Sequence, residues 1–137
     1  MEWTAWNWEA ILVHKLTCTG TTGRLVEETL LSKLGEGAQL QHPIIKLKSG
    51  PFGGDQQLGA LISQGKVDVV IFFWDPMQPH PHDVDVKALL RIAVLYNIPT
   101  ACNRSTADFI ISSPLMKTLY TPKARDFSEY TERGLPI

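Results

Sequence analysis

Short apolar runs alternate along the chain with longer stretches in which apolar side chains recur at helical spacing. Residues 67–73 are dominated by β-branched and aromatic side chains, which predicts a strand buried on both faces. Residues 84–97 carry Leu89, Ile92 and further apolar side chains on one helical face, so they predict the longest helix, ended by Pro99. Strands that alternate with helices in this way pair in parallel through right-handed crossovers. The pattern therefore indicates an α/β fold.

Turn and capping residues divide the rest of the chain into further elements. Strands are predicted at 15–18, 42–48 and 98–102, and helices at 24–34, 55–64 and from Ser105 or Thr106 to 111. The length of 137 residues fits a single domain over 1–137, with an atypical N-terminal segment at 1–15 and a C-terminal tail at 115–137. We expect a three-layer sandwich with a mainly parallel sheet.

Composition argues against several classes of partner. The chain has 13 Lys and Arg against 14 Asp and Glu, a net charge of −1, and 44% of its residues are hydrophobic. It therefore lacks the excess positive charge that binding to nucleic acid or an anionic membrane requires. No apolar run approaches the ~20 residues that cross a bilayer, and no secretory signal opens the chain, so we expect a cytoplasmic protein. Cys18 and Cys102 show no paired spacing and are expected to be buried thiols.

Three loops follow predicted strands and precede predicted helices, at 19–23, 49–55 and 75–85. In parallel sheets the carboxyl ends of the strands lie at one edge, where helix N-termini point inward and ligands collect. Candidate chemistry is therefore concentrated in these loops.

The first loop is rich in hydroxyl groups and glycine. Thr19, Thr21 and Thr22 supply hydroxyls, and Gly20 and Gly23 let the backbone N–H groups approach a ligand at the positive end of a helix dipole. This arrangement suits a phosphate group, although a tight turn with a threonine N-cap explains the same residues. The loop lacks the lysine of a P-loop, so it gives no indication of nucleoside triphosphate binding.

The second loop places three glycines around Pro51, ahead of an acidic residue that opens a helix. Asp55 is a candidate general base, and the alternative is that it caps the helix. Gln56 and Gln57 are interpreted as ordinary first-turn residues.

The third loop combines acidic side chains with imidazoles, the groups that carry proton chemistry near neutral pH. Asp83 and Asp85 have an alternative role as the N-cap and first-turn acids that complement a helix dipole. His80 and His82 have an alternative role as metal ligands, for which no other residues supply a matched set at diagnostic spacing.

Together the three loops resemble the methylglyoxal synthase family over about residues 16–114. The resemblance implies a Rossmann-like α/β fold and a cytosolic homohexameric lyase. It also implies conversion of dihydroxyacetone phosphate to methylglyoxal and inorganic phosphate, with no metal and no organic cofactor. The motifs that carry it are Thr19-Gly20-Thr21-Thr22-Gly23, Ser49-Gly50-Pro51-Phe52-Gly53-Gly54-Asp55-Gln56-Gln57, Phe72-Phe73-Trp74-Asp75-Pro76 and Pro81-His82-Asp83-Val84-Asp85-Val86-Lys87-Ala88-Leu89-Leu90-Arg91.

The resemblance also implies roles for individual residues. Asp55 is the expected base and later proton donor, His82 the expected hydrogen-bonding partner of the substrate oxygens, and Asp85 a carboxylate that orients His82 or tunes Asp55. The substrate and its phosphate are expected to contact Thr19, Gly20, Thr21, Thr22, Ser49 and Gly50.

The N-terminal segment differs from the family pattern. The family's domain opens with a strand ending in Ala-His-Asp and a helix that bears a lysine, whereas only a short segment precedes Thr19 here. We therefore expect the first strand to be absent and the phosphate site to lack that cation. The alternative function is an inactive or regulatory module of the same fold that binds a small anion without turning it over.

Overall fold

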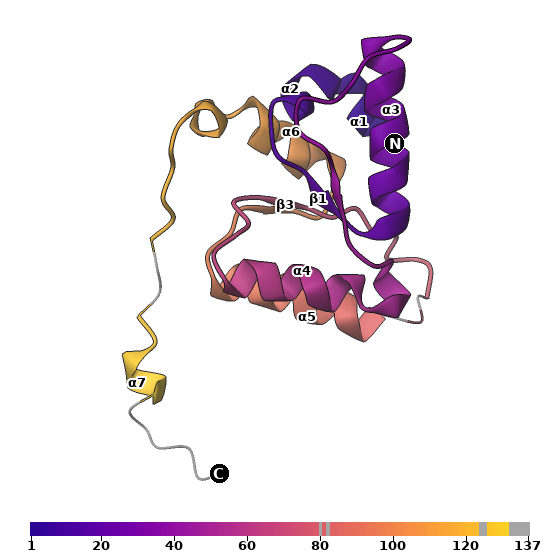
Figure 1. Ribbon diagram of the computed structural model, residues 1–137. Coiled ribbons are helices and arrows are strands. Elements are labelled where there is room, and N and C mark those ends of the chain that lie inside the picture. Colours follow the sequence, from indigo (N-terminus) through magenta and orange to yellow (C-terminus); the bar gives the residue numbers. More distant parts are fainter. Residues whose placement is uncertain (80, 82, 124–125, 132–137) are drawn as a thin grey trace.

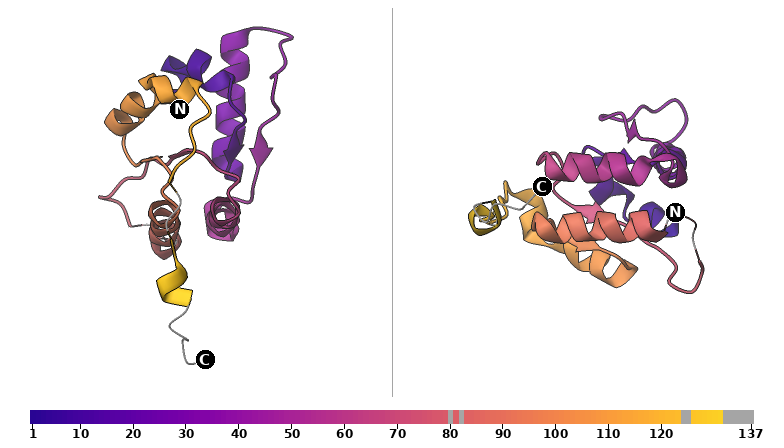
Figure 2. Two further views of the ribbon diagram at one scale, coloured as in Figure 1. Left: turned by 90° about the vertical axis from the view of Figure 1, so that its left-hand side faces the viewer. Right: turned by 90° about the horizontal axis from the view of Figure 1, so that it is seen from below.

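The computed structural model describes residues 1–79, 81, 83–123 and 126–131, and its helices and strands form three layers. Helices α4 (Gly54–Ser63) and α5 (Asp83–Leu95) cover one face of the strands. Helices α1 (Glu2–Trp6), α3 (Gly20–Leu34) and α6 (Arg104–Ser112) lie on the other face (Figures 1 and 2). The predicted three-layer α/β fold is confirmed.

The four strands found in the described part of the chain form two parallel pairs in the middle layer. Strand β1 (Thr17–Cys18) pairs with β2 (Ile45–Lys46), and β3 (Val70–Ile71) pairs with β4 (Thr100–Ala101). Parallel pairing is therefore confirmed. The expected single sheet, however, is divided, and within the described residues no strand joins one pair to the other.

The N-terminal segment is helical. Helices α1 and α2 (Trp8–Leu12) occupy the positions before β1, which agrees with the expectation that no strand precedes it. Trp3 is buried in the core, where its Nε1–H donates to Asp108 Oδ1 at 2.8 Å and its ring packs edge-on against Phe73. Trp3 thereby ties the N-terminal helices to α6 and to the loop that follows β3.

Two apolar clusters hold the layers together, one on each side of the strands. The first, on the side of α1 and α3, includes Trp3 and the fully buried Leu30. The second, on the side of α4 and α5, is made of Ile62, Val70, Leu89 and Ala93. Apolar burial stabilises a domain in proportion to the area removed from water. These clusters therefore hold the helices against the two faces of the strands.

The C-terminal part of the chain leaves the body of the molecule after the 3₁₀ helix η2 (Pro114–Lys117) (Figure 1). Asn97 Nδ2 donates to Lys123 O at 3.2 Å, and the Tyr96 ring contacts that of Phe127. The short helix α7 (Ser128–Thr131) follows. None of the described helices is long and apolar enough to cross a membrane.

Helix α6 begins earlier than the sequence predicts, because its cap is Asn103 and neither Ser105 nor Thr106. Asn103 Oδ1 accepts the Thr106 N–H at 2.9 Å. We expect Asn103→Ala to lower the free energy of unfolding by about 1 kcal/mol and the Tm by about 4 °C, measured by urea and thermal denaturation. Asn103→Asp keeps the acceptor and serves as the control. Equal stability of the two variants would contradict the role of the cap.

Candidate active site

The first two loops begin in the same way, at the carboxyl ends of the paired strands β1 and β2. Thr19 (φ −65°, ψ 155°) is the N-cap of α3, and Ser49 (φ −64°, ψ 155°) is the N-cap of the 3₁₀ helix η1 (Gly50–Phe52). Within the part of the chain that the structure describes, neither hydroxyl is used as a cap. Thr19 thus occupies the N-cap position, as the alternative of a threonine N-cap predicts, but its hydroxyl makes no capping hydrogen bond with the described residues. Both hydroxyls can therefore contact a ligand.

The first turn of α3 presents backbone donors at the carboxyl edge of β1. Thr21 and Thr22 are exposed, and among the described residues no acceptor pairs with the N–H group of either. The first N–H groups of a helix lack partners within the helix and lie at the positive end of its dipole, so they favour an anion. Helix α3 starts at Gly20, ahead of the predicted residue 24, which places these donors inside the helix.

The two loops are bonded to each other. The Gly20 N–H donates to Lys48 O at 3.3 Å, and a Cβ at Gly20 would stand 3.1 Å from Leu47 O and 3.3 Å from Ser49 N. Gly20 is thus needed for the close approach of the loops. Its amide holds Ser49 beside the start of α3.

Asp55 lies in the first turn of α4 and is buried, with 3% of its surface exposed. The N-cap of this helix is Gly53, which adopts the left-handed conformation (φ 103°), so the alternative that Asp55 caps the helix is wrong. The Gly54 N–H donates to Ser49 O at 3.1 Å and joins this turn to the Ser49 loop. A buried carboxylate at the carboxyl edge of parallel strands is a candidate general base.

Sequence reasoning missed the role of Gln57. The Gln57 Oε1 atom accepts the Lys48 N–H at 2.8 Å and so joins α4 to the end of β2. Glutamine in a first helical turn is common on exposed surfaces, and the chain offers no local signal for a contact with a residue nine positions earlier.

The third loop is described only in part, since the predicted residues His80 and His82 lie outside the described residues. Asp85 lies in the first turn of α5, as predicted, and is half-buried. Asp83, expected at the N-cap, is the first residue of α5. Asp83 is 3.6 Å from Lys87 in an ion pair. Within the described residues, no three side chains group closely enough to hold a metal ion.

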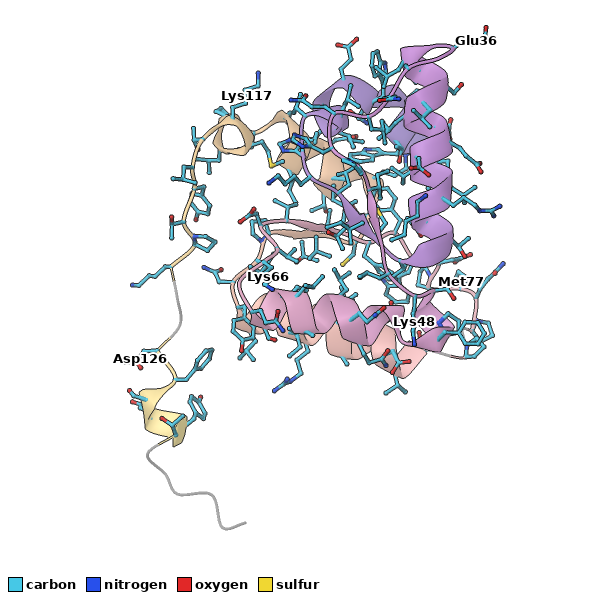
Figure 3. All side chains as sticks on the ribbon, viewed as in Figure 1. Glu36, Lys48, Lys66, Met77, Lys117 and Asp126 are labelled. Atoms are coloured by element: carbon cyan, nitrogen blue, oxygen red, sulfur yellow. The ribbon has the colours of Figure 1, made fainter. Side chains whose placement is uncertain are left out.

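Helix packing brings the second and third loops to one end of the molecule. Helices α4 and α5 pack along each other, and each starts at the carboxyl end of a strand (Figures 1 and 2). Lys48, which directly precedes the second loop, and Met77, in the third loop, lie at the end where these helices begin, whereas Lys66 lies at the far end of α4 (Figure 3). Asp55 and Asp85 therefore occupy first turns of adjacent helices at the same edge.

Cys18, which directly precedes the first loop, has a weakly reactive thiol. Burial raises the pKa of Cys18, at the end of β1, because a low-dielectric surrounding disfavours the thiolate. Cys18 and Cys102 are both free thiols, as the lack of paired spacing predicts, but each is half-buried and not fully buried as expected. Cys18 thus stays protonated at neutral pH and is a poor nucleophile.

The sequence of this chain matches one known protein family over most of its length. The model of the MGS-like domain matches residues 5–102, a span that includes all three loops. This chain belongs to the MGS-like family.

Individual relatives share this MGS-like chain over most of its length. A methylglyoxal synthase of Maridesulfovibrio salexigens is 63% identical over 126 residues, which cover 89% of this chain and 80% of that protein. One of Leptospira interrogans is 52% identical over 120 residues, covering 88% of this chain and 74% of that protein. The crystal structure of a methylglyoxal synthase from Elizabethkingia anophelis superposes with a TM-score of 0.84 at 46% identity, covering 98% of this chain and 82% of that one.

Proposed function

We propose that this chain is a methylglyoxal synthase, a lyase that converts dihydroxyacetone phosphate to methylglyoxal and inorganic phosphate. The observation that carries the proposal is the buried Asp55 carboxylate in the first turn of α4. In that turn the Gly54 N–H donates to Ser49 O, and the neighbouring Lys48 O accepts the Gly20 N–H from the start of α3. A base and an anion-binding helix start thus belong to one connected unit. The names of the relatives support the same reaction.

In the first step Asp55 takes a proton from the hydroxymethyl carbon beside the ketone. The C–H electron pair forms a carbon–carbon double bond, and the former carbonyl oxygen carries the negative charge of an enediolate. Asp55 suits this task by its place, because it is buried in the first turn of α4, beside the loop that bears Ser49.

In the second step the enediolate expels phosphate. The hydroxyl proton of the former hydroxymethyl group passes to the former carbonyl oxygen, and the electron pair left behind forms the aldehyde C=O. The double bond shifts to the carbon that bears the phosphate, and the C–O bond to phosphate breaks. The enol that remains gives its hydroxyl proton to the released phosphate, gains the proton held by Asp55 on its methylene carbon and becomes methylglyoxal, so the atoms of the substrate are shared between the two products. The C–O bond has to stand perpendicular to the enediolate plane for this shift, which makes the position of the phosphate decisive.

The proposed phosphate contacts are the hydroxyls and amides at the two helix starts: Thr19, Thr21, Thr22, Ser49 and Gly50. Gly20, expected to contact the phosphate, supports this set by holding the loops together through its own amide. The dipole of α3 stabilises the charge that the leaving phosphate acquires.

We assign supporting roles to the third loop. His82 is proposed to donate to the substrate oxygens as charge develops, and Asp85 to orient His82 or tune Asp55. Neither role requires a metal or an organic cofactor. As the family resemblance implies, we further propose a cytoplasmic homohexamer.

The function is tested by incubating the purified chain with dihydroxyacetone phosphate and measuring methylglyoxal and inorganic phosphate. Equal amounts of the two products are expected. A chain that is folded by circular dichroism and releases neither product would overturn the proposal.

A binding module is the second candidate, favoured by the exposed donors of Thr21 and Thr22, which can hold an anion without Asp55. Calorimetric titration with inorganic phosphate separates the two functions. Phosphate binding without product release would identify the module.

We expect His82→Gln to weaken the binding of substrate more than that of phosphate. Inorganic phosphate lacks the ketone and hydroxyl oxygens that His82 is proposed to contact, so its affinity should stay within about twofold, while KM rises about tenfold, as for one lost hydrogen bond of about 1.4 kcal/mol. The measurements are KM for dihydroxyacetone phosphate and the inhibition constant of phosphate. Equal weakening of both would contradict the assignment.

A further inference from the structure

The backbone of one residue, Lys48, joins three parts of the candidate site. Its carbonyl accepts the Gly20 N–H from the start of α3 at 3.3 Å. Its N–H donates to Gln57 Oε1 in α4 at 2.8 Å. The backbone of Gly54 packs directly against the same carbonyl, since a Cβ at Gly54 would stand only 1.9 Å from it. The Lys48 backbone therefore connects the anion-binding helix start to the helix that carries Asp55.

Gln57 contacts Lys48 through its side chain, whereas Gly20 and Gly54 contact it through their backbones. Its own N–H donates to Gly53 O at 3.0 Å, so the residue is fixed in the beginning of α4, two positions after Asp55. Ser49 directly follows Lys48. The hydrogen bond from Lys48 to Gln57 thus sets how the turn bearing Asp55 is rotated relative to the loop bearing Ser49.

We propose that Gln57 is a positioning residue that fixes the angle between the bound phosphate and the Asp55 carboxylate. This inference rests on the proposed function. The enediolate has two fates: it expels phosphate when the C–O bond stands perpendicular to its plane, or it takes the proton back on carbon. Gln57 holds the geometry in which expulsion is faster, and its loss shifts the enediolate toward reprotonation.

Three variants separate positioning from general damage. Gln57→Met removes the acceptor and keeps the length of the side chain. Gln57→Glu keeps an oxygen that accepts the Lys48 N–H and is the rescue variant. Gln56→Met is the matched control, because Gln56 is also exposed and lies one position earlier in the same turn.

The experiment incubates each protein with dihydroxyacetone phosphate in D₂O and follows two products by NMR. Methylglyoxal reports expulsion of phosphate, and deuterium in the recovered substrate reports reprotonation. We expect the ratio of deuterium exchange to methylglyoxal formation to rise about tenfold in Gln57→Met, for a displacement well under 1 Å. The ratio should stay within about twofold of the original in Gln57→Glu and Gln56→Met.

The ratio is independent of the amount of folded protein, because only active molecules contribute to either product. A Gln57→Met protein that loses both products in parallel, with an unchanged ratio, overturns the positioning role while leaving the proposed function intact. An equal rise in Gln56→Met also overturns it. An original chain that forms neither exchanged substrate nor methylglyoxal overturns the proposed function itself.

Discussion

The Asp55→Asn variant is expected to form methylglyoxal about 10³-fold more slowly than the original chain. An amide has nearly the shape of a carboxylate but cannot accept the proton from the hydroxymethyl carbon, so enediolate formation loses its base. The helix starts at Thr19 and Ser49 are unchanged, and phosphate should therefore bind with nearly its original affinity. Both quantities are measured on the same preparation, by methylglyoxal release and by calorimetric titration with phosphate.

The matched control is Asp68→Asn, which makes the same chemical change in an exposed residue before the start of β3. That strand end is opposite the candidate site, so activity should be unchanged. Loss of phosphate binding together with activity in Asp55→Asn would identify Asp55 as a structural residue. Full activity in Asp55→Asn would exclude it as the base.

The sequence predicts the layers and the placement of the loops because these depend on local patterns. The apolar spacing of Leu89 and Ala93 suffices to predict α5 and its buried face. Two glycines before Asp55 predict that it lies at the start of a helix, and the structure adds that it is buried. Such elements can be predicted because they depend on the types and spacing of residues that are close together in the sequence.

Contacts between distant segments explain what the sequence did not predict. Helix α3 starts at Gly20 although Gly-Thr-Thr-Gly has low helix propensity, because the Gly20 amide and the close approach to Leu47 fix the turn from outside. The strand predicted at 42–48 is paired only at Ile45 and Lys46. The sequence shows how many consecutive residues favour a strand. The number of residues that pair depends also on the neighbouring strand, here β1, which is two residues long.

The glycines of the second loop show the same limit. The repeated Gly-Gly suggests a flexible approach to a ligand, and Gly53 does adopt a positive φ. Gly54, by contrast, has ordinary helical geometry in the first turn of α4 and is required for its lack of a side chain. The local sequence does not indicate that the Lys48 carbonyl occupies the space beside Gly54 where a side chain would lie.

We expect Gly54→Ala to disable the site more severely than any substitution outside the catalytic groups. The added Cβ would stand 1.9 Å from Lys48 O, 2.9 Å from Lys48 C and 3.0 Å from Ser49 C. All three are backbone atoms, so no side chain can rotate away, and α4 has to move off the end of β2. A shift of about 1 Å between base and substrate costs about 100-fold in rate, and such overpacking destabilises by about 1–3 kcal/mol.

Gly59→Ala is the control, because it makes the same substitution in the same helix where a Cβ would meet nothing within 4 Å. Alanine is favoured over glycine inside a helix by about 1 kcal/mol, so this variant should be more stable than the original and equally active. The two proteins are compared by kcat/KM for dihydroxyacetone phosphate and by urea denaturation. Opposite signs in the two stability changes would show that contact with Lys48, and not helix propensity, requires glycine at position 54. Similar activity in both variants would mean that α4 moves away from β2 without disturbing Asp55, and the tight junction at Lys48 would then be irrelevant to catalysis.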